Sequence, residues 1–411
     1  MTKIKAFKAI RPVRDKVHLV ATRPYYSYKK NVLSAKLEDN PFTFLHIINP
    51  EFGSNVKTLA NTEERFNLVS ESYKKFISEG ILIKEKEETI YIYRQSIGQH
   101  QFTGVIAGAS IQEYEDDLIK KHEATITSRE GMFTNYLDVV GYNAEPVLLS
   151  YTHSDELDAL LADYTKSRPE YEFSTTDRIK HELWVLSQND SKNIISSFEK
   201  IDCCYIADGH HRSASSAALA KIRREKGNTT ADNKDFFLAY FIDENRMKIL
   251  EFNRLVKTLN GLTKSEFLDK ISIHFLIEKL SKAQKPLKEH QITVCIEGDW
   301  YLLISKPEII QSEHPVKCLD PEILTQFILS PILGIQDLKT DENIEFISGA
   351  ESIEKFEDQI LNDKFKIGFI LFPVTIDQVK RVADNQMIMP PKSTWVEPKM
   401  RSGLTIYNIN E

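Results

Sequence analysis

The chain has 411 residues, which predicts two or three domains at roughly 150 residues per domain. Hydrophobic residues make up 41% of the sequence and charged residues 27%, as is usual for a globular protein with a sizeable core. Because 53 Lys and Arg stand against 60 Asp and Glu, the net charge is −7. A general basic field for binding nucleic acid or a membrane is therefore disfavoured, while a local basic patch stays open.

The sequence also predicts a cytoplasmic protein without a membrane span. Its first residues are charged every few positions and lack the apolar segment of a signal peptide. The strongly apolar stretch 365–374 is too short to cross a bilayer and contains Lys366 and Pro373. No CxxC spacing, and hence no zinc knuckle or disulfide framework, occurs among the four cysteines, Cys203, Cys204, Cys295 and Cys318.

The first 60 residues show no regular period, but a helix is expected directly after them. Asn61 or Thr62 can cap this helix, and Gly80 suits its C-terminal end. Its apolar residues recur at spacings of three and four, at Phe66, Val69, Tyr73 and Phe76. Two β-type runs, 89–95 and 102–110, then predict a hairpin.

Short strands and helices alternate through the middle of the chain. Strands are expected at 146–151, 203–207, 236–242 and 248–252, the last two as a pair, and helices at 155–164, 191–198 and 213–224. After Gly261 the pattern predicts a hairpin of 291–295 with 301–305, a strand at 367–372, and helices at 262–276, 320–329, 352–361 and 376–384.

The most informative stretch is the turn 205–213, with the sequence YIADGHHRS. A buried strand runs into Gly209, where a ligand can approach the backbone closely, and then into a helix. The first N–H groups of a helix have no intrahelical partner and carry the positive end of its dipole, which suits a phosphate. Arg212 adds a planar fork for two phosphate oxygens, and His210 or His211 can donate to a third.

Asp208 in the same turn has several interpretations. It could hold a Mg²⁺ ion, orient a histidine, or cap the helix while one histidine packs in the core. Ser213, at the end of the run, is a further candidate for binding phosphate. GxxxxGK[ST], GxGxxG and GxSxG are all absent, so the sequence supports neither a P-loop nor a Rossmann turn and disfavours an α/β-hydrolase.

A second candidate is the pair His122 and Glu123, which follows an acidic run at 113–117. A carboxylate beside a histidine is commonly a solvated surface pair, and the residues alone favour that interpretation. The same letters recur in Lys180-His181-Glu182, where the apolar residues that follow predict a strand with alternate side chains buried.

A third candidate is the proline-rich stretch 389–403, in which prolines prevent a regular helix. It could close a site and supply cations to a phosphate, or serve as a structural strap with its tryptophan buried. The residues proposed for such a site loop are Lys392, Ser393, Thr394, Trp395, Lys399 and Arg401.

Three separated motifs together resemble one family. They are the opening KIKAF, the Asp208–Arg212 turn, and PPKSTWVEPK at 390–399. The sequence is similar over essentially its whole length to the bacterial and archaeal family known as domain of unknown function 1015.

A more distant resemblance implies a fold and an activity. The strand, D-G-H-H-R turn and helix resemble the phosphate-handling motif of the ParB/sulfiredoxin superfamily, which includes nucleotide-dependent free L-serine kinases. In those kinases a strand leads to a His-Glu pair whose glutamate is the catalytic base. The resemblance covers residues 100–260 and assigns Glu123 as that base, with His122 beside it, and residues 208–212 as the nucleotide-phosphate turn.

We therefore expect an α+β protein with a ParB/sulfiredoxin-like core. The expected parts are an N-terminal α/β segment at 1–100, the nucleotide-binding core at 101–260, and a C-terminal α+β domain with a site-covering loop at 261–411. The expected activity is phosphoryl transfer to a small hydroxyl metabolite, with Mg²⁺ and with ATP or ADP as donor. Free L-serine is the expected acceptor, and removal of phosphate from phosphoserine is the reverse direction.

Of two other classes of function, the first stays open and the second is disfavoured. The first is a ParB-like switch that binds a nucleotide without metabolic turnover. Its DNA-clamping version is disfavoured by the net charge and because KIRREK at 221–226 is the only dense basic run. The second is a sulfiredoxin-like redox enzyme, which requires a cysteine in the phosphate turn, where this sequence has histidine.

Overall fold

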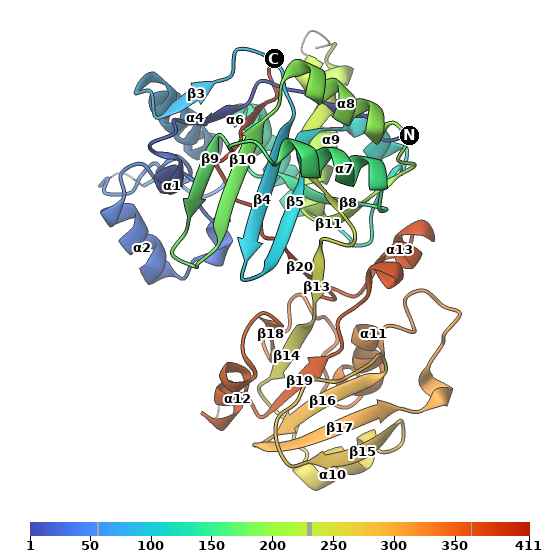
Figure 1. Ribbon diagram of the computed structural model, residues 1–411. Helices are drawn as coiled ribbons and strands as arrows, with labels where there is room; N and C mark the ends of the chain where they lie inside the picture. Colours follow the sequence, from blue (N-terminus) through green and yellow to red (C-terminus); the bar gives the residue numbers. More distant parts are fainter. Residues whose placement is uncertain (56, 228–231, 363) are drawn as a thin grey trace. The chain divides into compact units, whose positions relative to one another are not determined.

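The hairpin predicted at 89–95 and 102–110 forms the middle of a large mixed sheet (Figure 1). The structure, a computed structural model, describes residues 1–55, 57–227, 232–362 and 364–411. In it β4 (Tyr91–Ile97) and β5 (His100–Ser110) pair antiparallel, so that the predicted hairpin is confirmed. Every residue of β5 after its first two is buried, and the strand has sheet neighbours along both edges.

Within the described residues this sheet has nine strands, in the order β6-β11-β8-β12-β5-β4-β10-β9, and β1 pairs with β5 as well. The strands not yet given are β1 (Ile4–Lys5), β6 (Ile119–Lys120), β8 (Val147–Tyr151), β9 (Tyr171–Ser174), β10 (Lys180–Val185), β11 (Cys204–Asp208) and β12 (Phe236–Asp243). The strand that enters the D-G-H-H-R turn, β11, lies antiparallel to β8 and parallel to β6. This inner position explains why the strand predicted at 203–207 is buried.

Helices pack against this sheet and against one another. Their bounds are α4 (Glu63–Ser78), α5 (Ile111–Glu115), α6 (Thr127–Val140), α7 (Asp155–Tyr164), α8 (Gln188–Phe198) and α9 (His210–Glu225). Leu157 and Leu161 of α7 and Phe198 of α8 join the main core of the sheet. The helix predicted after residue 60 is confirmed as α4, with the side chain of Thr62 capping its N-terminus.

The first 60 residues contain short elements that their sequence does not predict. These are β2 (Ile10–Pro12), α1 (Val17–Val20), the 3₁₀ turn η1 (Tyr25–Ser27), α2 (Lys30–Asp39) and α3 (Leu45–Ile48). The ten-residue helix α2 has no capping side chain and buries only Leu37, so neither a capping signal nor an apolar stripe marks it.

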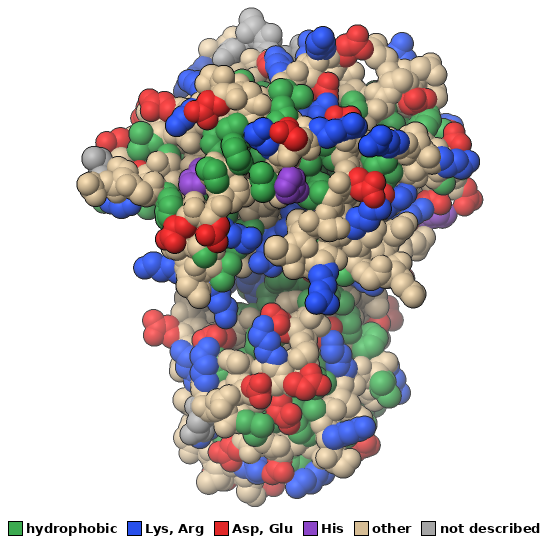
Figure 2. All heavy atoms as spheres, turned by 60° about the vertical axis from the view of Figure 1, so that its left-hand side comes forward, with side chains coloured by type: hydrophobic (Ala, Val, Ile, Leu, Met, Phe, Trp, Pro, Cys, Tyr) green, Lys and Arg blue, Asp and Glu red, His purple; other side chains and the backbone are tan. Residues whose placement is uncertain are grey.

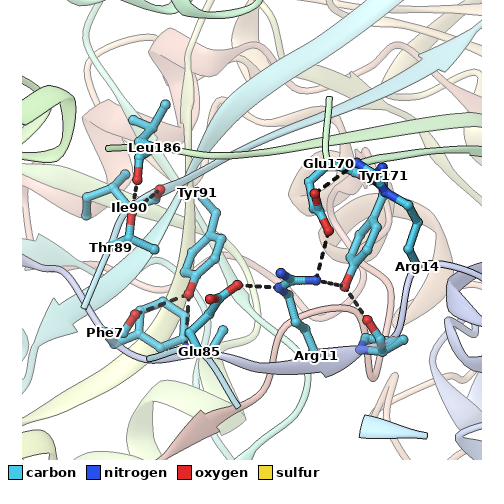
Figure 3. Close-up of polar contacts among 12 residues, drawn as sticks. Phe7, Arg11, Arg14, Glu85, Thr89, Ile90, Tyr91, Glu170, Tyr171 and Leu186 are labelled. Carbon is cyan, nitrogen blue, oxygen red and sulfur yellow. Dashed lines mark hydrogen bonds and ion pairs between the residues drawn. The ribbon is translucent and has the colours of Figure 1, made fainter. Parts of the chain in front are cut away.

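A polar network ties this N-terminal segment to the large sheet (Figure 3). The guanidinium of Arg11 on β2 donates to Glu85 and Glu170 and to the hydroxyl of Tyr171. The hydroxyl of Tyr91 accepts from the backbone of residue 9 at 3.0 Å and donates to that of residue 7 at 3.2 Å. The segment is thus fixed to strands β4 and β9 although it is largely irregular. Two small pairs complete the unit, β2 with β3 (Leu82–Lys84) and β7 (Tyr142–Asn143) with β21 (Tyr407–Asn408).

A second sheet has six strands among the described residues, in the order β15-β17-β16-β19-β14-β18. Their bounds are β14 (Phe252–Val256), β15 (Phe275–Leu280), β16 (Gln291–Ile296), β17 (Asp299–Ser305), β18 (Ile344–Ser348) and β19 (Ile367–Leu371). One face packs on α10 (Lys264–Ile271), α11 (Asp320–Leu324) and a π-helical turn (Thr325–Leu329), and the other on α12 (Ile353–Leu361). The helix α13 (Ile376–Asp384), the 3₁₀ turns η2 (Asp232–Asp235) and η3 (Pro307–Ile309), and the strands β13 (Lys248–Leu250) and β20 (Trp395–Glu397) complete the elements.

The hairpin predicted in the C-terminal part is confirmed, whereas two other predictions are wrong. The strands β16 and β17 pair as expected. The strands predicted at 236–242 and 248–252 do not pair, because β13 pairs with β20 while β12 lies between β5 and β8. The helix predicted at 262–276 ends at Ile271, and its last part begins β15.

By their internal contacts the residues form two units. Unit 1 comprises residues 1–121, 125–247 and 398–411, and unit 2 comprises 122–124 and 248–397. The divisions expected at residues 100 and 260 differ from these units. The β4–β5 hairpin crosses residue 100, and β14 belongs to the second sheet although it ends before residue 260. The mixed α+β class is as predicted.

Charged side chains of both signs alternate over the face drawn in Figure 2. Lys and Arg are interspersed there with Asp and Glu, in agreement with the slightly negative net charge. Among the described residues, none of the helices combines the length and the apolar character that a bilayer crossing requires.

Candidate functional site

The predicted turn is formed where β11 ends and α9 begins. Gly209 is the N-cap of α9 and has φ of 105°, a backbone conformation that residues with a side chain rarely adopt. A Cβ atom at this position would lie 3.1 Å from the guanidinium of Arg212. Glycine is therefore required both by the backbone and by the arginine that folds over it.

The guanidinium of Arg212 is held by two carboxylates. Its Nη2 lies 2.9 Å from Asp208 and its Nη1 2.7 Å from Glu145. Nη1 also donates to the carbonyl of Pro146 at 2.5 Å. Asp208 thus orients an arginine rather than capping the helix, because the N-cap is Gly209.

A second cation reaches the turn from the C-terminal segment. The ammonium of Lys399 lies 3.6 Å from Asp208 Oδ1, and the side chain of Gln95 donates to the Lys399 carbonyl at 3.0 Å. The hydroxyl of Ser402 donates to Glu145 at 2.9 Å. Within unit 1, the segment after Pro398 therefore packs against the turn, and two cations stand beside two carboxylates.

The two carboxylates have opposite pKa shifts. Burial raises the pKa of Glu145, and the charge of Arg212 only partly opposes that effect. Burial acts in the same direction on Asp208, but Lys399 and Arg212 together hold the pKa of this carboxyl below its usual value. Asp208 is therefore the anion that the two cations favour, and Glu145 is the carboxylate closer to accepting a proton.

Sequence reasoning missed Glu145. It lies just before β8, and β8 is the antiparallel neighbour of β11, with Leu148 opposite Asp208. A Glu-Pro pair ahead of a buried strand is the only local signal in the sequence. That signal becomes informative only when the pairing of β8 with β11 is known.

The remaining residues of the turn lie on the first turn of α9. His210 is buried and His211 is half-buried. This agrees with the alternative interpretation in which one histidine of the turn packs in the core. The hydroxyl of Ser213 is buried and donates to the carbonyl of His210 at 3.0 Å. The phosphate-binding roles of these three residues stay predictions.

His122 and Glu123 lie on the three-residue segment that belongs to unit 2. His122 is buried rather than a solvated surface residue, and burial lowers its pKa to about 4. Its carbonyl accepts from the backbone of Met389 at 2.9 Å, whereas Glu123 is exposed. The turn belongs to unit 1, so the assignment of Glu123 as its catalytic base stays a prediction.

The repeat of these letters at 180–182 is structural. It starts β10, and His181 is buried with its two ring nitrogens near the hydroxyls of Tyr93 at 2.8 Å and Thr175 at 3.2 Å. Burial lowers the pKa of His181 to about 3, so the ring is neutral. The strand predicted here is confirmed.

The proposed site loop divides between the units at Pro398. Of its residues, Lys399 contacts the turn, and Arg401 is buried and pairs with Asp177 at 3.0 Å. The others lie in unit 2, where the Ser393 hydroxyl donates to a loop carbonyl and the Trp395 indole donates to Glu397. Lys392 and Thr394 also lie in unit 2, the latter directly before β20.

The same turn could bind a metal ion only if a bound ligand supplied some of the coordinating oxygens. Among the described residues no three His, Cys, Asp or Glu side chains gather around one point. Asp208 and Glu145 could contribute carboxylate oxygens, and Mg²⁺ commonly takes one or two of these and completes its octahedron with phosphates and water. The two carboxylates therefore fit Mg²⁺ in company with a nucleotide.

Two other features of unit 1 are unrelated to the turn's chemistry. The buried thiol of Cys204, just upstream on β11, has its pKa raised to about 12 by burial, as expected of an inert cysteine.

A cavity of about 420 Å³ beside β9 is lined by charges that pair with one another, Arg14 with Glu170 and Lys180 with Glu172. None of the predicted site residues lines it.

Comparison with protein families matches residues 4–322 to the family described as "Protein of unknown function (DUF1015)". The chain belongs to this family. The match includes the Asp208–Arg212 turn and Glu145 of this DUF1015 protein and stops before its C-terminal segment. A search of curated proteins finds no match.

Three of the solved structures that are similar to this DUF1015 protein each share low sequence identity with it. Free serine kinase in complex with AMP is 12% identical, with a TM-score of 0.37 over 74% of this chain and 91% of that one. SbnI with a C-terminal truncation, from Staphylococcus aureus, is 10% identical, with a TM-score of 0.38 over 71% and 82%. A conserved hypothetical protein from Pyrococcus furiosus is 14% identical, with a TM-score of 0.33 over 73% and 95%. Likeness of this size assigns no activity, and we interpret the site of the DUF1015 protein from its own residues.

Proposed function

We propose that this protein is a nucleotide-dependent phosphotransferase that acts on a small hydroxyl metabolite. Free L-serine is the proposed acceptor, and phosphoserine dephosphorylation is the reverse direction. The observation that supports the proposal most strongly is the turn itself, where Gly209, the N-terminus of α9, and the side chains of Arg212 and Lys399 meet.

The turn has the properties that binding of a nucleotide phosphate requires. The N–H groups of the first helical turn and the helix dipole favour an anion at this end of α9. Lys399 is a point charge on a flexible stem, and Arg212 is a planar donor already oriented by Asp208 and Glu145. Donors held in place before the reaction stabilise developing charge without reorganising.

Transfer to serine forms a bond between the serine hydroxyl oxygen and the terminal phosphorus and breaks the bond from that phosphorus to the bridging oxygen. The leaving nucleotide takes the bond's electron pair, and the hydroxyl proton goes to a carboxylate. We propose Glu123 as this base on the ground of the resemblance to free serine kinases, and its side chain is exposed. Bound Mg²⁺, with Asp208 as ligand, would supply neutralisation of phosphate charge.

A second candidate function is a nucleotide-binding switch without metabolic turnover. It is favoured by one observation, that Arg212 and Lys399 both contact Asp208. A phosphate that takes these cations would compete with Asp208 for them, and the contact of Lys399 with Asp208 would then be weakened. Binding would in this way change a surface without chemistry.

The test is to incubate the purified protein with Mg²⁺, L-serine and either ATP or ADP, and to measure phosphoserine by mass spectrometry. A parallel sample contains phosphoserine alone. Phosphoserine formed with one nucleotide would support the kinase and name its donor. Serine released together with inorganic phosphate from phosphoserine alone would support dephosphorylation, in which water takes the phosphoryl group. Nucleotide binding without turnover would favour the switch, and neither binding nor turnover would contradict both.

A further inference from the structure

The second unit contains a buried arginine that has no oppositely charged partner among the described residues. Arg254 lies on β14, between β18 and β19 (Figure 1), with Phe346 and Phe369 as its cross-strand neighbours. Its side chain is fully buried, and it forms no ion pair with any carboxylate of the described residues. Burial without a compensating charge lowers the pKa of Arg254 to about 9. An ion in such surroundings is costly unless something pairs with it.

The unused part of this guanidinium is the edge that recognises oxyanions. Nη1 donates to the backbone carbonyl of Phe252, and one face of the group lies over the Phe346 ring, 5.4 Å from its centre. Nε and Nη2 have no hydrogen-bond partner among the described residues. These two nitrogens share one edge, from which arginine makes two parallel bonds to a carboxylate or a phosphate.

We propose that Arg254 is the receptor of an oxyanion, a carboxylate or phosphate group of a ligand that binds to unit 2. The backbone carbonyl and the aromatic ring fix the guanidinium, and the ligand supplies the two acceptor oxygens that the part of the chain described by the structure does not. This site is separate from the Asp208–Arg212 turn and does not rest on the proposed phosphotransferase function.

Another buried arginine, Arg11, differs from Arg254 in having carboxylate partners. Arg11 in unit 1 is also buried, but Glu85 and Glu170 pair with it. The chain thus supplies carboxylates to an arginine whose role is structural. Arg254 has none among residues 1–55, 57–227, 232–362 and 364–411, which is the arrangement expected when the anion comes from outside.

The proline-rich loop adds a second positive charge near this site. Within unit 2, Phe252 contacts both the Trp395 ring, with centroids 5.4 Å apart, and the Lys392 ammonium, 5.4 Å from the ring centre. Phe252, whose carbonyl accepts a hydrogen bond from Arg254, therefore also contacts the loop that contains Lys392. The positive charge of Lys392 favours an anion over a neutral ligand.

The test measures thermal unfolding of the full chain with increasing inorganic phosphate and, separately, acetate, each against sodium chloride of equal ionic strength. At saturation the effective anion should raise Tm by roughly 4 °C. Arg254→Met should abolish this increase, and without anion its Tm should equal or exceed that of the wild type because the unpaired buried charge is gone. Arg381→Met, which changes an exposed arginine of unit 2, should respond like the wild type.

A second variant keeps the proposal testable if Arg254→Met does not fold. Arg254→Lys keeps the charge but lacks the two-donor edge, so its anion affinity should fall at least tenfold. A response to phosphate alone would identify a phosphate-bearing ligand, and a response to acetate alone a carboxylate. The proposal is overturned if neither anion shifts the Tm of the wild type, or if the Arg254 variants keep the full response.

Discussion

Arg212 Nη1 and Glu145 Oε1 lie 2.7 Å apart, an ion pair that joins the first turn of α9 to the segment leading into β8. The pair connects two neighbouring strands of the large sheet through the residues at their ends, since β11 enters α9 and lies beside β8. Through Arg212, Glu145, which no sequence motif indicates, is brought to the same guanidinium as Asp208, which lies in the predicted turn.

This pair should show energetic coupling in a double-mutant cycle. Arg212→Met leaves Glu145 largely buried without its cation, and we expect a loss of about 2 kcal/mol in the free energy of unfolding. The double variant with Glu145→Gln should lose less than the sum of the two single changes. Urea denaturation of all four proteins measures the coupling, and strictly additive losses would show that the two side chains act independently.

Glycine should be required at position 209 and not at a helical control position. Gly209→Ala places a side chain on a backbone with φ of 105° and against the Arg212 guanidinium, at a cost of about 1–3 kcal/mol. Gly131, inside α6, has open space around it, and alanine there should stabilise the protein by about 0.5–1 kcal/mol. Thermal and urea unfolding compare the two. Equal effects would mean that the turn is not strained.

Lys399 should contribute to nucleotide affinity through its charge at the turn. Lys399→Gln is expected to weaken ATP or ADP binding roughly tenfold, or about 1.4 kcal/mol, because a cation 3.6 Å from Asp208 is lost. Lys166→Gln, which removes an exposed lysine of unit 1 that pairs with Asp163, is the matched control. Isothermal titration calorimetry measures both, and an unchanged affinity of the Lys399 variant would exclude it from the phosphate site.

Glu123 should be needed for turnover but not for nucleotide binding. Glu123→Gln keeps the shape of the side chain and removes its capacity to accept a proton, so we expect the rate to fall by 10²-fold or more. Glu182→Gln is the control with the same local sequence, since Glu182 lies on β10 beside Lys180 and Arg94. Rates by mass spectrometry and affinities by calorimetry separate the two effects. A fully active Glu123 variant removes this residue from the mechanism.

His153 should make stability depend on pH. Hydrogen bonds to Asp243, at 2.6 Å, and Asp155, at 3.1 Å, raise the pKa of His153 above its unfolded value of about 6.5. A raised pKa stabilises the folded state fully below the unfolded pKa, and this stabilisation is lost as pH rises through the folded pKa. Unfolding measured from about pH 5 to 9 should show this decline, and His153→Gln should remove it.

The same titration can be resolved by NMR. Asp155 is fully exposed and Asp243 is buried, so Asp155→Asn should lower the pKa of His153 less than Asp243→Asn does. An identical pKa in both variants and in the wild type would contradict the assignment.

Local sequence patterns predicted the elements that carry the turn. The period of α4, the β4–β5 hairpin and the passage from β11 through Gly209 into α9 are all confirmed, because each follows from side chains close together in the chain. The short helices before residue 60 were missed, since α2 buries only one side chain and has no cap.

The partners of strands were the weakest predictions. The sequence marks β13 as a strand but does not tell that β20 rather than β12 is its neighbour. Pairing between distant strands depends on the faces they bury together, and neither strand carries that information in its own period. The same reason explains why Glu145 was missed.

By itself the sequence determined that this is an α+β chain of the DUF1015 family whose turn at 208–212 contains a glycine and an arginine. Only the tertiary structure decided which charges surround Arg212, that Lys399 reaches Asp208, and that Arg254 is buried with no carboxylate of the described residues paired to it. The physical reason is that a residue's type sets its chemistry locally, whereas the partners of a charge come from strands and segments far along the chain. Those partners meet only when the strands pair and the segments pack against the sheets.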